Sequence, residues 1–159
     1  MPRIDIDAIE WKGGTGYPEQ FRDLVQGRER KRLGDAGGLT QFGVNLTRLA
    51  PGAGSAHRHW HESEDEFVFI LAGEVTLIED DGETLLRAGD AAAFKAGVAN
   101  GHHLVNRSAG DVTYLEIGTR APTDRGTFPD IDLAFVKDAD GARWTRKDEG
   151  LQADRETRR

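Results

Sequence analysis

Between Thr40 and Gly118 the sequence is a series of short apolar segments, separated by turns that contain glycine, aspartate or proline. Most segments alternate apolar and polar residues, the period of a β-strand with one buried face, and a helical period is almost absent. The expected strands lie at residues 42–49, 66–71, 75–78, 84–86, 91–94, 103–106 and 112–117. Strands of this length and spacing predict an antiparallel sandwich or barrel, so the fold class is all-β.

Three details sharpen this prediction. The chain has 20 glycines in 159 residues, well above the average usage of roughly 7%, as frequent turns require. Asp81-Gly82 separates two of the expected strands and is a strong hairpin signal. The run Glu66–Leu71 is apolar on both alternating faces, which predicts a strand that is covered on both sides.

The sequence divides into four parts. Residues 39–120 are expected to form the barrel, and residues 1–38 an N-terminal extension that packs on it. Residues 121–150 are expected to be a C-terminal segment that also packs on the barrel. Residues 151–159 hold one leucine among charged and polar residues and are expected to be disordered.

Within the two extensions the patterns are weaker. Residues 4–8 alternate like a short edge strand, and residues 18–25 could form a brief helix that begins at a proline. The basic run 28–32 is short and interrupted, so a solvated surface explains it better than a binding patch. Residues 130–136 are a plausible last strand, and Trp144 is expected to hold this segment against the body.

Charge and composition exclude several functions. The formal net charge is −7, which opposes binding to a nucleic acid backbone. The absence of cysteine excludes disulfides, thiolate ligands and thiol nucleophiles. No apolar stretch has the length of a signal peptide or a membrane span, so a soluble cytoplasmic protein with no membrane partner is expected.

The five histidines are the best clue to function. His57, His59 and His61 are spaced by two, whereas His102 and His103 are neighbours about forty residues later. On a strand, side chains two apart share a face, so a His-x-His pair can converge on one metal ion. A carboxylate of the next strand and a histidine of an opposing strand could complete the site. Imidazole and carboxylate ligands suit Zn, Mn, Fe, Ni or Cu and do not select among them.

The histidines and the residues around them resemble the motifs of the cupin superfamily. The first cupin motif is G-x5-H-x-H, three or four residues, E, six residues, G. His59, His61, Glu66 and Gly73 reproduce its second half, whereas Gly52 lies seven residues before His59, one more than the motif has.

The second cupin motif, G-x5-P-x-G-x2-H-x3-N, matches in part. Gly89 and Gly97 have the expected spacing, and Lys95 replaces the proline. The histidine follows two residues late, where His102-x3-Asn106 restores the ending. The resemblance covers residues 40–118 and implies an antiparallel double-stranded β-helix, or jelly-roll barrel.

Carried over by position, the resemblance implies four metal ligands: His59, His61, Glu66 and His102. His103 is the alternative to His102 if the longer loop shifts the register. His57 should share the face of His59 and is the candidate group for catalytic proton transfer, although it could instead support the ligands or replace His61.

Other polar residues near the motif are interpreted more simply. Glu62, Glu64 and Asp65 are expected to be a solvated loop. Trp60 is expected to pack on the outer face. Tyr114 and Glu116 could face the cavity, but the strand parity does not decide this.

The resemblance favours a metal-dependent enzyme that acts on a small polar molecule, such as a sugar or an organic acid. An isomerase, a lyase and a dioxygenase all fit, except that the absence of cysteine excludes a Cys–Tyr crosslinked thiol dioxygenase. The alternatives are a non-catalytic small-molecule-binding or sensor protein and a barrel with a structural metal. A homodimer is expected, because the face with Phe67, Phe69 and Leu71 needs covering.

Overall fold

The computed structural model describes residues 2–148, which form three antiparallel sheets. The largest has the order β1-β2-β9-β4-β7, formed by Arg28–Arg32, Phe42–Leu49, Val112–Thr119, Glu66–Ala72 and Ala91–Phe94. The second has the order β6-β5-β8, formed by Gly82–Arg87, Glu74–Glu79 and His103–Val105. The third has the order β12-β11-β10-β3, formed by Gly141–Thr145, Leu133–Asp138, Asp124–Phe128 and Trp60–His61.

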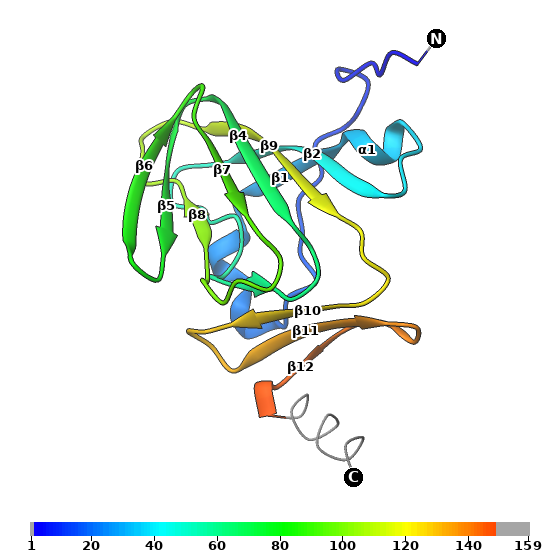
Figure 1. Ribbon diagram of the computed structural model, residues 1–159. Helices are drawn as coiled ribbons and strands as arrows, with labels where there is room; N and C mark the ends of the chain where they lie inside the picture. Colours follow the sequence, from blue (N-terminus) through cyan, green and yellow to red (C-terminus); the bar gives the residue numbers. More distant parts are fainter. Residues whose placement is uncertain (1, 149–159) are drawn as a thin grey trace.

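The main core lies between the first two sheets. In Figure 1 the strands β5, β6 and β8 lie to one side of β4 and β9, and β10, β11 and β12 run beneath them. The core combines side chains of the five-stranded sheet with side chains of the three-stranded sheet: Leu49, Val68, Ile70, Val112 and Tyr114 with Val75, Leu77 and Leu86, together with Leu104. The all-β antiparallel prediction is therefore confirmed.

A second, smaller core joins the two ends of the chain. Tyr17 and Val25 from the N-terminal region pack with Phe128 and Leu133 from the third sheet. Trp144 stacks on Tyr17 with ring centroids 4.8 Å apart, so the expectation that this tryptophan holds the C-terminal segment is confirmed.

The interpretation of residues 28–32 as a solvated surface is wrong. They form β1, which pairs with β2 from Arg28↔Leu49 to Arg32↔Asn45. Arg28 and Lys31 are buried, because main-chain pairing holds the strand in the sheet although it carries no apolar residue. The sheet thus acquires a row of positive charge that the sequence pattern did not reveal.

The prediction that Glu66–Leu71 is covered on both sides is also wrong for this chain. In β4, Val68 and Ile70 are buried, whereas Phe69 and Leu71 are 36% and 43% exposed. One face of the strand packs in the core, and the other lies on the surface.

The extensions differ from their predictions in detail. Residues 4–8 form no strand in the described chain, and the helix expected at 18–25 consists of two 3₁₀ turns, η1 (Glu19–Phe21) and η2 (Asp23–Val25). A four-residue helix, α1 (Leu33–Ala36), follows β1. The last predicted strand begins later, at Leu133. The tail predicted at 151–159 lies outside the described residues, and no helix within residues 2–148 is long and apolar enough to cross a membrane.

Candidate metal centre

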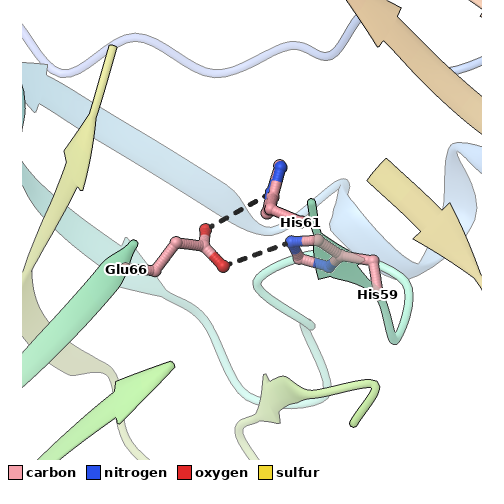
Figure 2. A group of neighbouring side chains, drawn as sticks. All are labelled: His59, His61 and Glu66. Carbon is pink, nitrogen blue, oxygen red and sulfur yellow. Dashed lines mark ion pairs between the residues drawn. The ribbon is translucent and has the colours of Figure 1, made fainter. Parts of the chain in front are cut away.

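Three of the four predicted ligands form one compact cluster. The ligand atoms of His59, His61 and Glu66 all lie within 4.8 Å of one another. Nε2 of His59 is 3.7 Å from one carboxylate oxygen of Glu66, and Nε2 of His61 is 3.7 Å from the other. Figure 2 shows both rings directed at the carboxylate, His61 from β3, His59 from just before it and Glu66 from the start of β4.

The fourth predicted ligand reaches the same carboxylate. Nε2 of His102 lies 2.7 Å from Oε2 of Glu66. Two backbone hydrogen bonds, 2.9 and 3.1 Å long, pair His102 with His59, so the loop before β8 runs beside the histidine segment. The ring of His102 stacks on Phe94 with centroids 3.6 Å apart. Glu66 is thus surrounded by three imidazoles.

Hydrogen bonds on the far side of two rings fix their orientation. Nδ1 of His59 lies 2.8 Å from the backbone carbonyl of His57, and because a carbonyl only accepts, Nδ1 carries the proton. Nδ1 of His61 lies 2.5 Å from Oδ2 of Asp124, whose side chain is completely buried. Each Nε2 is left to face Glu66. Asp124 comes from β10, 63 residues away in the chain, and no sequence pattern marks it as part of the site.

Contacts within the cluster shift the pKa values of Glu66 and His61. Burial alone would raise the pKa of Glu66, but contact with His102 and His59 holds the pKa of this carboxyl well below its usual range. Burial alone would lower the pKa of His61, but the hydrogen bond to Asp124 and the charge of Glu66 raise it. Glu66 is therefore an anion, and of the imidazoles around it His61 has a raised pKa.

The donor chemistry of this cluster fits a metal ion. In neutral His59, Nε2 presents a lone pair to a carboxylate oxygen that is also an acceptor, so a cation between them removes the repulsion. Buried carboxylates and carbonyls behind ligating histidines are a usual feature of metal sites. His59, His61 and Glu66 could hold a metal ion, and nitrogen with oxygen ligands does not identify which one.

His57 and His103 lie elsewhere. Residues 55–58 are bends and not strand, so His57 does not share the face of His59, and that expectation is wrong. Nε2 of His57 lies 2.8 Å from the carbonyl of Phe21, and its ring packs against Tyr17 and Phe21. A proton-transfer role for His57 stays a prediction, with its ring bound outside the cluster. Nδ1 of His103 lies 2.8 Å from the carbonyl of Ala56, so the geometry favours His102 over His103 at Glu66.

The acidic segment after His61 is only partly solvated. Glu62 is exposed as expected, and Asp65 accepts a 2.8 Å hydrogen bond from the backbone of Ala96. Glu64 is an exception, because it is half-buried and forms an ion pair with Lys137 of β11. Glu64 also lies with His61 and Asp124 in a second group of close ligand atoms, so its interpretation as a solvated loop residue is wrong.

The cluster opens into a cavity of about 470 Å³, a size usual for small-molecule sites. Its lining includes both residues whose direction strand parity left open, Tyr114 and Glu116 of β9. Oε1 of Glu116 binds Nε of Arg30 and, at 3.0 Å, Nδ2 of Asn45. Arg28 and Arg30 of β1 also line the cavity. The sequence interpretation missed both arginines, since their position depends on β1 joining the sheet.

Comparison with known proteins identifies the family and the fold of the chain. The family model described as "Cupin domain" matches residues 45–118. A sugar phosphate isomerase of the cupin superfamily from Silicibacter pomeroyi is 48% identical, with 92% of this chain and 94% of that chain covered and a TM-score of 0.89. None of the curated proteins compared with the chain matches it.

Two further crystal structures are more distant. A candidate sugar phosphate isomerase from Acidithiobacillus ferrooxidans is 28% identical, with 77% of this chain and 78% of that chain covered and a TM-score of 0.72. A predicted oxalate decarboxylase from Thermotoga maritima is 21% identical, with 75% and 99% covered and a TM-score of 0.61, and this likeness shows the fold alone.

Proposed function

The chain belongs to the cupin superfamily, and from this membership we propose that it is a metal-dependent isomerase of sugar phosphates. The observation that carries the proposal is the group of imidazoles around Glu66 at the wall of a 470 Å³ cavity. The 48% identity to a sugar phosphate isomerase over almost the whole chain supports isomerisation in preference to lyase or oxygen chemistry.

The proposed ligands are His59, His61, Glu66 and His102, with Asp124 and the carbonyl of His57 behind them. A divalent ion bound there would polarise a carbonyl or hydroxyl oxygen of the sugar. The cavity walls contribute the remaining functions, which are to orient the sugar and to move its proton.

Glu116 is the proposed base. On paired strands β9 and β4, Glu66 lies opposite Gly118, and Glu116 is two residues from Gly118 on the same face. Diagonal neighbours of this kind lie about 7–8 Å apart, with their Cβ atoms somewhat closer, which leaves room for a sugar carbon between the two carboxylates. Arg30 and Asn45 bind Oε1, whereas Oε2 has only a long contact of 3.4 Å to Arg30. Oε2 is therefore the atom available to accept a proton.

The proposed isomerisation moves two protons within the sugar phosphate. Glu116 takes the proton from C2 of an aldose phosphate and returns it to C1, while the proton of the C2 hydroxyl moves to the oxygen on C1. One C–H bond breaks and one forms, so no oxidant or other reactant is consumed. Tyr114, buried on the same strand face, borders this part of the cavity.

The proposal is tested by incubating the metal-loaded protein with a panel of triose to heptose phosphates in D₂O and following the sugars by NMR. Interconversion of one aldose–ketose pair, with deuterium entering at C1 or C2, is expected. Glu116→Gln should lower kcat by about 10²–10⁴-fold with a smaller change in KM, the usual range for loss of a general base. Glu83→Gln, at an exposed position on β6, is the matched control and should retain activity. Consumption of O₂, or no conversion of any sugar phosphate by the metal-loaded protein, would contradict the proposal.

The ligand assignment has a separate test in the metal content of purified variants. His59→Ala, Glu66→Gln and His102→Ala should each lower the metal content, whereas His103→Ala should keep it. Stoichiometric metal in the His59 or Glu66 variant would show that the assignment is wrong.

A further inference from the structure

The side chain of Arg28 is a buried cation without a carboxylate partner. The residue is only 6% exposed. Its guanidinium donates a hydrogen bond to the backbone carbonyl of Ser55, and within residues 2–148 no acidic side chain forms an ion pair with it. A guanidinium has five N–H donors, so most of its donors have no partner in the described chain.

Arg30, two residues along the same strand, provides the contrast. Its guanidinium forms an ion pair with Glu116, and the negative charge of Glu116 raises the pKa of Arg30 although burial alone would lower it. For Arg28, burial and the positive charge of Arg30 lower the pKa, and the negative charge of Glu116 offsets them only in part. Burial of an unpaired charge is costly, so a group that compensates Arg28 is expected.

The neighbours of Arg28 in the sheet supply no such group. Its partner on β2 is Leu49, which in turn lies opposite Val112 of β9, and both are completely buried apolar residues. The adjacent row contains Arg30, Thr47 and Tyr114. The hydroxyl of Tyr114 is buried without a hydrogen-bond partner in the described residues. Arg28 and Tyr114 both line the 470 Å³ cavity.

A second hydroxyl borders the same region. Tyr17 lines the cavity, and burial raises its pKa to about 12, so its hydroxyl keeps its proton at neutral pH. The oxygen accepts a 3.2 Å hydrogen bond from the backbone of His57, which leaves the O–H free to donate. One guanidinium and two tyrosine hydroxyls with unused donors thus belong to residues that line a single cavity.

We propose that Arg28 and Tyr114 bind the phosphate group of the substrate. The inference rests on the proposed function, because it names the part of the sugar phosphate that this side of the cavity holds. A planar guanidinium pairs with two oxygens of a phosphate at once, and the hydroxyl donates to a third. The phosphate then lies on the β1 side of the cavity, and the sugar carbons extend towards Glu116 and Glu66.

The test measures binding of inorganic phosphate to the metal-free protein by calorimetry or ³¹P NMR, so that neither catalysis nor a metal ion contributes. Arg28→Met should weaken phosphate binding about 10- to 100-fold, the range for a lost charge-assisted hydrogen bond. Tyr114→Phe should weaken it less, by a few-fold. Arg107→Met, on an exposed arginine that pairs with Glu83, is the matched control and should bind phosphate like the unaltered protein.

Arg28→Lys guards against misfolding of the methionine variant, because it retains the charge and loses the fork. This variant should keep the melting temperature and still bind phosphate more weakly. Equal phosphate affinity in the Arg28 variants and the unaltered protein would overturn the inference, and so would acetate binding as tightly as phosphate. Loss of phosphate binding without any isomerase activity would support the subsite and contradict only the proposed reaction.

Discussion

At the scale of single residues, Asp124 decides how His61 presents itself to the cluster. Its buried carboxylate accepts a hydrogen bond from Nδ1–H of His61 and a 2.9 Å hydrogen bond from the backbone of Ser63. A carboxylate in this position makes the opposite nitrogen of the imidazole a stronger ligand. His59 has a neutral backbone carbonyl in the equivalent place, so the two rings are oriented by acceptors of different charge.

The Asp124→Asn variant should bind Zn²⁺ about 10- to 100-fold more weakly, because the amide cannot increase the basicity of His61 as the carboxylate does. The asparagine oxygen can still accept from Ser63, so the melting temperature of the metal-free protein should change little. Competition titration with a chromophoric chelator gives the affinity. Asp138→Asn, at the β11–β12 hairpin, is the control, and equal affinities in the two variants would show that Asp124 does not act on the site.

Metal affinity should depend on pH through His61. Burial alone would lower its pKa, but Asp124 and Glu66 raise it above the ordinary value near 6.5. Protonated His61 therefore stabilises the metal-free protein below the ordinary pKa, and this contribution is lost as the pH rises through the raised pKa. Because a metal must displace that proton, affinity should fall by about tenfold per pH unit and per proton below the raised pKa. Calorimetry in two buffers of different ionisation enthalpy measures the protons released, and a constant affinity through this range would contradict the prediction.

Whether a site residue could be predicted depends on how far apart in the sequence the residues that define its role lie. His59, His61 and Glu66 could be predicted because the spacing of a short segment carries the information. His102 required only the assumption that an opposing strand returns beside them, and backbone pairing with His59 agrees with it. Asp124 and Arg28 could not be predicted, since their roles depend on contacts with residues 63 and 27 positions away. His57 was misplaced because the segment before His59 bends where a strand was assumed.

At the scale of strands and turns, the glycine that ends the first motif has a physical explanation. Gly73 joins β4 to β5 with φ at +79°, in the left-handed region that residues with a Cβ seldom adopt. A Cβ at this position would lie 2.6 Å from the backbone oxygen of Asp111, at the start of β9. Turn geometry and close packing thus both require glycine at position 73, with six residues between it and Glu66.

Gly73→Ala should lower the free energy of unfolding by about 2 kcal/mol or more, because the backbone strain alone is worth roughly 1–2 kcal/mol and the contact with Asp111 adds to it. Gly110→Ala is the control in the neighbouring loop, where an added Cβ meets no atom within 4 Å. Urea unfolding followed by circular dichroism measures both. Similar midpoints for the two variants would contradict the explanation.

The strands themselves were predicted with unequal success. The segments at 42–49, 75–78 and 112–117 were predicted because alternation and turn residues coincide there. β1 consists only of arginine, lysine and glutamate, so no hydrophobic period marks it, and its place follows from hydrogen bonding to β2. β10 was missed for a similar reason, since Asp124–Phe128 contains one large apolar residue.

At the scale of the whole molecule, the outer face of β4 stays a candidate for self-association. Phe69 and Leu71 project from the same face of the strand and remain over one third exposed. Adjacent exposed large apolar residues of this kind usually mark an interaction surface. The homodimer inferred from the sequence therefore stays a prediction.

Phe69→Glu should convert a dimer into a monomer, because dimerisation would bury the introduced charge. Size-exclusion chromatography with light scattering should give twice the 17.5 kDa of the chain for the unaltered protein and 17.5 kDa for the variant. Ile6→Glu places the same charge on an exposed apolar residue of the N-terminal region and should not change the mass. A monomeric unaltered protein at micromolar concentration would exclude the dimer.

Asp124 lies outside the segment that supplies the proposed metal ligands. All four proposed ligands lie in the segment 39–120, whereas the carboxylate that orients His61 belongs to the strands after it. A protein shortened after residue 120 would retain every ligand and lose that carboxylate, together with Phe128, which stacks on His59. The segment that supplies the metal ligands is thus separate from the segment that orients them. Grafting the barrel alone onto another protein would transfer the ligands without the carboxylate that orients His61.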